Sequence, residues 1–179
     1  MNREPHPVAR LWKFWKVIWS VLTTLLVIIV VLLAVALVGV RLLGYTPYAI
    51  LSPSMTPDYQ VGDLVYVKSV EPEHIMVGDV LTFVANEELV VVTHRVDEAD
   101  RENRLFYTKG DANESRDSAP VLYENVIGVV KFSLPMLGYV STYFTSTSGR
   151  FAGMALVFFL ILLYIIPELI KSGKKQKDE

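Results

Sequence analysis

The stretch VIWSVLTTLLVIIVVLLAVALVGV, residues 17–40, is an apolar run without a single charged side chain. As a helix rising about 1.5 Å per residue, it covers about 36 Å, more than the roughly 30 Å hydrocarbon core of a bilayer. The tripeptide AVA at Ala34–Ala36 is similar to a leader-peptide cleavage site, but the apolar run continues past it and is longer than a leader requires. We therefore predict an uncleaved transmembrane helix over residues 17–40.

A second apolar run, FAGMALVFFLILLYII, covers residues 151–166 and is followed by Pro167 and Glu168. It spans about 24 Å as a helix, near the lower limit for crossing a bilayer. Hydrophobic residues make up 52% of the 179-residue chain and charged residues 20%, a balance that favours a membrane protein with a polar domain. We predict a shorter second transmembrane helix over residues 151–170.

The charge distribution predicts the orientation in the membrane. Residues 41–150 hold 9 Lys and Arg against 15 Asp and Glu, a net charge of 9 − 15 = −6. Basic residues instead flank the two apolar runs on their outer sides: Arg3, Arg10, Lys13, Lys16, Lys171, Lys174, Lys175 and Lys177. Because basic loops stay in the cytoplasm, residues 1–16 and the tail 171–179 are predicted to be cytoplasmic, and residues 41–150 extracytoplasmic. The chain should therefore be a multi-pass protein of the cell membrane, and it lacks the basic patch that nucleic-acid binding requires.

The segment between the two apolar runs is predicted to be one mainly β domain. Four stretches are rich in alternating or β-branched residues and are separated by Gly, Pro, Asn and Asp: DLVYVKSV (63–70), GDVLTFV (78–84), ELVVVTHRV (88–96) and NVIGVVKFSL (125–134). The chain has no cysteine, which excludes disulfides and thiolate chemistry, so that any nucleophile must be oxygen or nitrogen.

Two of the three histidines belong to this predicted extracytoplasmic domain. His74 follows Pro72 beside acidic residues and is predicted to be a solvated loop residue. His94 differs, because alternation along its strand places it on one face with Val92 and Val96. A histidine on an apolar face is either a satisfied core residue or a catalytic base, and its neighbours must decide between the two.

The candidate partners of His94 lie in two polar segments. SPSMTP, residues 52–57, begins soon after the first apolar run, so Ser54 should lie near the outer membrane surface. A serine needs a base to act as a nucleophile, whereas the simpler interpretation of this segment is a proline-fixed turn. TKGDANESRD offers Asp111 and Asp117, either of which could orient His94, although such loops are usually only solvated.

Together, SPSMTP, THRV and KGDANESRD resemble, in this order, three sequence boxes of the type I signal peptidases. They are most similar to the archaeal and endoplasmic-reticulum branch, which uses histidine where the bacterial branch uses lysine. The resemblance covers the whole chain, and the first box is its most specific part. It implies an extracytoplasmic catalytic domain of antiparallel β-sheets flanked by two transmembrane helices.

The resemblance also implies a role for each matched residue. Ser54 would attack the scissile carbonyl, His94 would act as general base, and Asp117 would orient His94, with Asp111 as the second candidate for the acid. The hydroxyl of Ser52 and the backbone amide of Ser54 would stabilise the oxyanion.

Further expectations concern the substrate and the partners. Strand segments near Met55 are expected to bind the substrate as an added strand, with shallow pockets for small residues of the Ala-x-Ala type. Ala112 stands where the family commonly has Asn, which would weaken a loop hydrogen bond. The implied partners are precursor proteins that carry signal peptides, the lipid bilayer and the protein-export channel.

Two alternatives remain open from the sequence. The same reaction could use a Ser/Lys dyad, for which Lys68, Lys109 and Lys131 are the available lysines. The chain could instead be a non-catalytic, membrane-anchored β-rich module that binds a partner at the cell surface, with Ser54 as a turn residue. No cofactor is predicted, because the spacing of the histidines and carboxylates is not that of a zinc site.

Overall fold

The computed structural model describes residues 7–85 and 90–175. The chain divides into two compact units, residues 1–39 with 160–179, and residues 40–159. Parts of three predicted segments lie outside the described residues: the beginning of the N-terminal segment, the start of the strand predicted over 88–96, and the end of the basic tail.

The first helix, α1, covers Pro7–Leu37, and it therefore begins ten residues before the predicted span and ends three residues before the predicted end. Pro7 occupies its first position, where a missing amide hydrogen costs no hydrogen bond. Within α1, Phe14–Leu37 is long and apolar enough to cross a membrane, and none of its most apolar window is buried. A short 3₁₀ helix, Gly39–Leu43, follows. These features fit a helix whose side chains contact lipid.

The C-terminal part of the chain consists of two helices, α2 (Leu137–Thr145) and α3 (Thr147–Lys175). They meet at a bend of 96°. Only the pair taken together, Leu137–Thr145 with Thr147–Leu162, meets the same criterion of length and apolarity among the described residues. The second transmembrane helix therefore stays a prediction, although α3 continues as a helix through Pro167.

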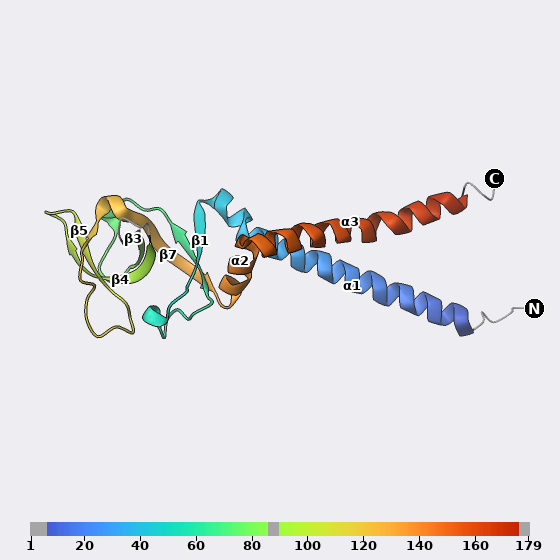
Figure 1. Cartoon of the computed structure of the whole chain (residues 1–179), viewed down its shortest axis with the longest axis horizontal. Helices are drawn as coiled ribbons and strands as arrows, with labels where there is room; N and C mark the ends of the chain where they lie inside the picture. Colours follow the sequence, from blue (N-terminus) through green and yellow to red (C-terminus); the bar gives the residue numbers. More distant parts are fainter. Residues whose placement is uncertain (1–6, 86–89, 176–179) are drawn as a thin grey trace, which may run out of the picture. The chain divides into compact units, whose positions relative to one another are not determined.

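One seven-stranded sheet forms the β domain, with the strand order β1-β2-β7-β3-β4-β5-β6 and antiparallel pairing throughout (Figure 1). The strands are β1 (Tyr45–Ala49), β2 (Leu64–Lys68), β3 (Val80–Val84), β4 (Val91–Asp100), β5 (Leu105–Lys109), β6 (Val121–Leu122) and β7 (Val126–Leu134). The mainly β domain and its antiparallel sheet are thus as predicted, and all four predicted strands form. The prediction lacked β1, β5 and β6.

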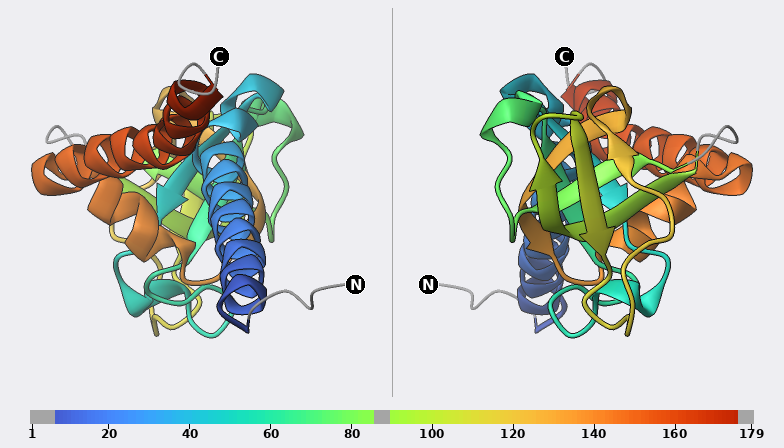
Figure 2. Two further views of the ribbon diagram at one scale, coloured as in Figure 1. Left: turned by 90° about the vertical axis from the view of Figure 1, so that its right-hand side faces the viewer. Right: turned by 90° about the vertical axis from the view of Figure 1, so that its left-hand side faces the viewer.

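The sheet is strongly curled (Figure 2), and irregular register accompanies the curl. The pairing shifts between Tyr66 and Val67, between Thr82 and Phe83, and near Val96. Such bulges bend a strand and increase its twist. β7 pairs with β2 along one part and with β3 along another, so it joins the two halves of the curled sheet.

Two clusters of buried apolar side chains stabilise the domain. One lies under β3, β4 and β5 and consists of Ile75, Leu81, Phe83, Val96, Phe106, Val121, Tyr123 and Val129. The other lies under β2 and the Ser54 segment and consists of Ile50, Met55, Val65, Val67, Val80 and Val130. Because Met55 belongs to the second cluster, the turn that carries Ser54 is fixed to the core.

Candidate active site

Ser54 lies in a rigid turn after β1. The residues Pro53–Met55 form one turn of 3₁₀ helix with a proline at its start. The carbonyl of Pro53 accepts hydrogen bonds from both the amide and the hydroxyl of Thr56, at 3.0 and 2.8 Å. On the next position, the side chain of Met55 is only 1% exposed. The Ser54 hydroxyl is therefore presented from a short segment with little freedom to move.

His94 lies on β4, opposite Leu81 of β3, and is 9% exposed. Its neighbour two residues along, Val96, is buried on the same face, as alternation predicts. The His94 Nε2 atom lies 3.1 Å from Ser54 Oγ, and Nδ1 lies 2.7 Å from Asp117 Oδ2. The structure thus brings together three side chains that are 40 and 23 residues apart in the chain.

Asp117 is positioned by the end of β5. Its amide donates a hydrogen bond to the Thr108 carbonyl at 2.9 Å, and its Oδ2 accepts one from the Thr108 hydroxyl at 2.7 Å. The Asp117 side chain is 23% exposed. Thr108 was not among the residues expected at the site. Two signals in the sequence could have found it: it is the first residue of TKGDANESRD, and it is a polar residue that alternates with Phe106 in the run LFYTK.

The positions of the protons follow from the chemistry of the partners. A carboxylate only accepts, so the hydrogen bond to Asp117 requires a proton on His94 Nδ1. In the neutral imidazole Nε2 then accepts, and the Ser54 hydroxyl donates to it. Ser52 Oγ lies 3.1 Å from Ser54 Oγ. Because Ser54 has one proton to donate, Ser52 must be the donor in that contact.

The loop after β5 also contacts the Ser54 turn through its backbone. The amide of Ala112 donates to the Ser54 carbonyl at 2.9 Å, and the amide of Asn113 donates to the Gly110 carbonyl at 2.9 Å. A Cβ atom added at Gly110 would lie 2.7 Å from the Ser54 carbonyl oxygen. The contact of Ala112 is made by its backbone, so its side chain is not needed for this particular hydrogen bond.

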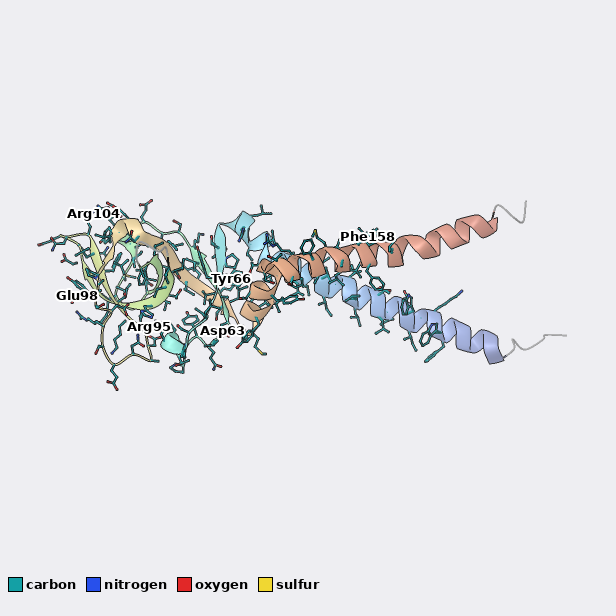
Figure 3. All side chains as sticks on the ribbon, in the orientation of Figure 1. Asp63, Tyr66, Arg95, Glu98, Arg104 and Phe158 are labelled. Carbon is teal, nitrogen blue, oxygen red and sulfur yellow. The ribbon has the colours of Figure 1, made fainter. Side chains whose placement is uncertain are left out.

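Asp111, the second candidate for the acid, binds Arg95 rather than His94. Arg95 Nε and one terminal nitrogen donate to the two Asp111 oxygens at 2.8 and 2.6 Å, and that nitrogen also donates to Asp58 at 2.8 Å. Its other terminal nitrogen donates to the Gly78 carbonyl at 2.9 Å. The hydrogen bonds that Arg95 donates to Asp111 raise the pKa of Arg95 above its ordinary value. Arg95, which Figure 3 labels within the β domain, therefore links three separate loops through Asp111, Asp58 and Gly78.

Other residues considered from the sequence lie in different surroundings. His74 is exposed, as predicted for a loop residue. Lys68 is also exposed, and its ammonium lies 5.4 Å from the centre of the Tyr45 ring. Met55 is only 1% exposed and belongs to the core, and substrate binding by the strand segments near it stays a prediction. Among the described residues, no group of three or more His, Asp or Glu side chains is arranged to hold a metal ion.

A hydroxyl, an imidazole and a carboxylate hydrogen-bonded in a row form the type of site that serine hydrolases use. The family model described as signal peptidase, peptidase S26, matches residues 21–109, which include Ser54 and His94. The Asp111 and Asp117 positions lie just beyond the matched residues.

Individual proteins that are similar to this chain are also named as signal peptidases. The chain is 41% identical to signal peptidase I W of Bacillus subtilis over 88 residues, which is 48% of this chain and 46% of that protein. It is 32% identical to the signal peptidase complex catalytic subunit SEC11 of Zygosaccharomyces rouxii over 123 residues, 62% of this chain and 71% of that one. The corresponding subunit of Ogataea parapolymorpha is 33% identical over 129 residues, 60% and 73% of the two chains.

The chain belongs to the peptidase S26 family of signal peptidases. The resemblance inferred from the three sequence boxes is thereby confirmed at the level of the family. The match spans about half the length of the Bacillus relative and about seven-tenths of the yeast subunits.

Proposed function

We propose that this chain is a membrane-anchored serine endopeptidase that removes N-terminal signal peptides from exported precursor proteins after small residues of the Ala-x-Ala type. The observation that carries the proposal is the row of contacts from Ser54 Oγ to His94 Nε2 at 3.1 Å and from His94 Nδ1 to Asp117 Oδ2 at 2.7 Å. Family membership supports the reaction class, and this geometry supports the role proposed for each residue.

In the proposed mechanism, Ser54 Oγ attacks the scissile carbonyl carbon while His94 Nε2 takes the hydroxyl proton. The Asp117 carboxylate keeps the Nδ1–H tautomer of His94 and stabilises the imidazolium that forms. The imidazolium then gives its proton to the leaving amine, and an acyl-enzyme remains on Ser54. A water molecule, deprotonated by His94, releases the cleaved peptide in the same way.

The tetrahedral intermediate carries a negative oxygen that needs hydrogen-bond donors. The Ser54 amide is a candidate donor, because it makes no hydrogen bond within residues 7–85 and 90–175. The Ser52 hydroxyl, now 3.1 Å from Ser54 Oγ, would turn from that oxygen to the oxyanion. Loss of one such donor typically costs on the order of 100- to 1,000-fold in kcat.

The surroundings of the protein are also part of the proposal. Helix α1 would anchor the chain in the cell membrane, and α3 would return it across the bilayer, so that both termini are cytoplasmic and the β domain is extracytoplasmic. Precursors that carry signal peptides, the bilayer and the protein-export channel would be its partners. The relatives named as catalytic subunits of a signal peptidase complex support a search for partner subunits as well.

The test is cleavage of a membrane-inserted Ala-x-Ala precursor by the purified full-length protein in one detergent. Ser54→Ala, His94→Ala and Asp117→Asn should each lose most of the activity while remaining folded by circular dichroism. Matched controls change the same residue types elsewhere on the surface: Ser69→Ala for the serine and His74→Ala for the histidine, both exposed. Normal cleavage by Ser54→Ala would refute the proposal and favour the non-catalytic binding module.

The Ser/Lys dyad makes a different prediction in the same assay. If a lysine were the base, Lys68→Ala would abolish cleavage and His94→Ala would not. The hydrogen bond between Ser54 and His94 favours the histidine mechanism, whereas Lys68 lies beside the Tyr45 ring.

A further inference from the structure

The buried hydroxyl of Thr108 has no role in the proposed mechanism, yet it contacts the proposed triad directly. The residue is 0% exposed, and its hydroxyl lies 2.7 Å from Asp117 Oδ2, its one hydrogen-bond partner within the described residues. That oxygen is the one that accepts from His94 Nδ1, also at 2.7 Å. The Thr108 carbonyl accepts from the Asp117 amide at 2.9 Å. Asp117 is therefore bound to Thr108 through both its backbone and its side chain.

The two contacts with Thr108 restrict the orientation of the Asp117 carboxylate, which a loop backbone alone would leave variable. The terminal torsion of an aspartate is broad, so the backbone alone does not decide which oxygen faces His94. The Asp117 side chain is 23% exposed, and water can compete for its oxygens. A donor fixed in a strand holds one oxygen in place.

Packing alone does not explain a hydroxyl at this position. Thr108 lies opposite Val96 in the pairing of β4 with β5, beside the buried Phe106. A valine has nearly the same shape and would fill this apolar site, whereas a threonine must satisfy its hydroxyl. Asp117 is the group that satisfies it.

We propose that Thr108 is a positioning residue that holds the Asp117 carboxylate in the orientation in which Oδ2 accepts from His94 Nδ1. The inference rests on the proposed function, because it assigns Thr108 a part in the same reaction. Thr108 contacts no reacting atom and acts only through Asp117.

The variant Thr108→Val removes the hydroxyl and keeps the shape. Thr82 supplies a matched control: it is also 0% exposed, lies on β3 of the same sheet, and its hydroxyl contacts Thr93 at 2.9 Å rather than the site. We expect Thr108→Val to lose roughly 10- to 100-fold in kcat, the size expected for losing a hydrogen bond to a charged group. Its pH–rate profile should also have a displaced acidic limb, while Thr82→Val keeps both the rate and the profile. Thr108→Ser should restore most of the rate.

A second readout does not depend on cleavage. With ¹⁵N-labelled imidazoles, the unmodified protein should show His94 as the Nδ1–H tautomer, and Thr108→Val should show a mixture of tautomers. If Thr108→Val does not fold, the pair Thr108→Ser and Thr108→Ala isolates the hydroxyl instead. The positioning role is wrong if removal of the hydroxyl changes neither the pH profile nor the tautomer.

The failure of the proposed function has a separate signature. If Ser54→Ala and His94→Ala cleave the precursor as well as the unmodified protein, the triad is not the catalytic site. The tautomer measurement then still decides whether Thr108 orients Asp117, because it reads His94 directly.

Discussion

Replacement of Gly110 by alanine tests whether the loop after β5 determines the position of the nucleophile. An added Cβ would lie 2.7 Å from the Ser54 carbonyl oxygen and 2.7 Å from Asn113 Nδ2, whereas ordinary contact begins at 3.4 Å. The two segments must therefore separate by about 3.4 − 2.7 = 0.7 Å. The movement would also weaken the hydrogen bond from the Ala112 amide to the same Ser54 oxygen, now 2.9 Å long.

The expected effect on catalysis follows from the size of this displacement. A misplacement of about 1 Å can cost about 100-fold in rate, so we expect Gly110→Ala to lose roughly tenfold or more in kcat. Crowding of a packed site costs about 1–3 kcal/mol, so the variant should remain folded but melt at a lower temperature. The assay is cleavage of the membrane-inserted precursor, with kcat and KM measured separately, alongside thermal unfolding in the same detergent.

Gly44→Ala provides the control for backbone strain alone. Gly44 has a φ of +79°, and nothing lies within 4 Å of an added Cβ, so the substitution strains the chain without pushing on the Ser54 turn. It should lower stability and leave kcat unchanged. A Gly110→Ala protein with the kcat of the unmodified enzyme would refute the reasoning, because Ser54 would then tolerate the displacement.

Three further outcomes are expected. Met55→Ala should lower the free energy of unfolding by about 2–5 kcal/mol in a denaturant titration, because this core side chain is 1% exposed; an unchanged transition would contradict that. Burial raises the pKa of Tyr59, so the folded chain binds this proton more tightly than the unfolded chain, and stability is complete below about pH 10 and falls as pH rises further. Tyr59→Phe should therefore flatten the alkaline loss of stability measured by the same titration. Cleavage should decline on acidification, since a protonated His94 cannot accept the Ser54 proton, and a constant rate between about pH 5 and about pH 9 would speak against this base.

The sequence predicted the parts of the fold that depend on local periodicity. Alternation identified β2, β3, β4 and β7, since residues two apart share a face of a strand. The same alternation placed His94 on the buried face of β4, where it is found. Two of the strands that were missed have weaker signals. β1 contains Pro47, which is tolerated because β1 lies at the edge of the sheet, and β6 has only two residues. β5 is as long as β2 and β3, and its length does not explain why it was missed.

The partners within the site could not be derived from spacing. Asp111 and Asp117 lie in one loop, and either one was compatible with a contact to His94. Tertiary contacts distinguish the two carboxylates. Arg95 of β4 binds Asp111, whereas Thr108 of β5 binds Asp117. A local sequence pattern does not determine which strand faces which loop. Only the three-dimensional structure therefore distinguishes the acid that contacts His94 from the one that does not.

The alternation of β4 also explains how two loops reach one base. His94 faces the core side and contacts Ser54 Oγ, while Arg95, the next residue, holds Asp58 and Asp111 by ion pairs of 2.8 and 2.6 Å. Asp58 lies four residues after Ser54, and Asp111 lies six residues before Asp117. One dipeptide of one strand therefore contacts the proposed catalytic groups on one face and, through the other face, binds the segments that carry them. An imidazole at position 94 and a permanently charged guanidinium at position 95 suit these two roles. The proposed base must gain and lose a proton, whereas the side chain that holds the two loops must keep its charge.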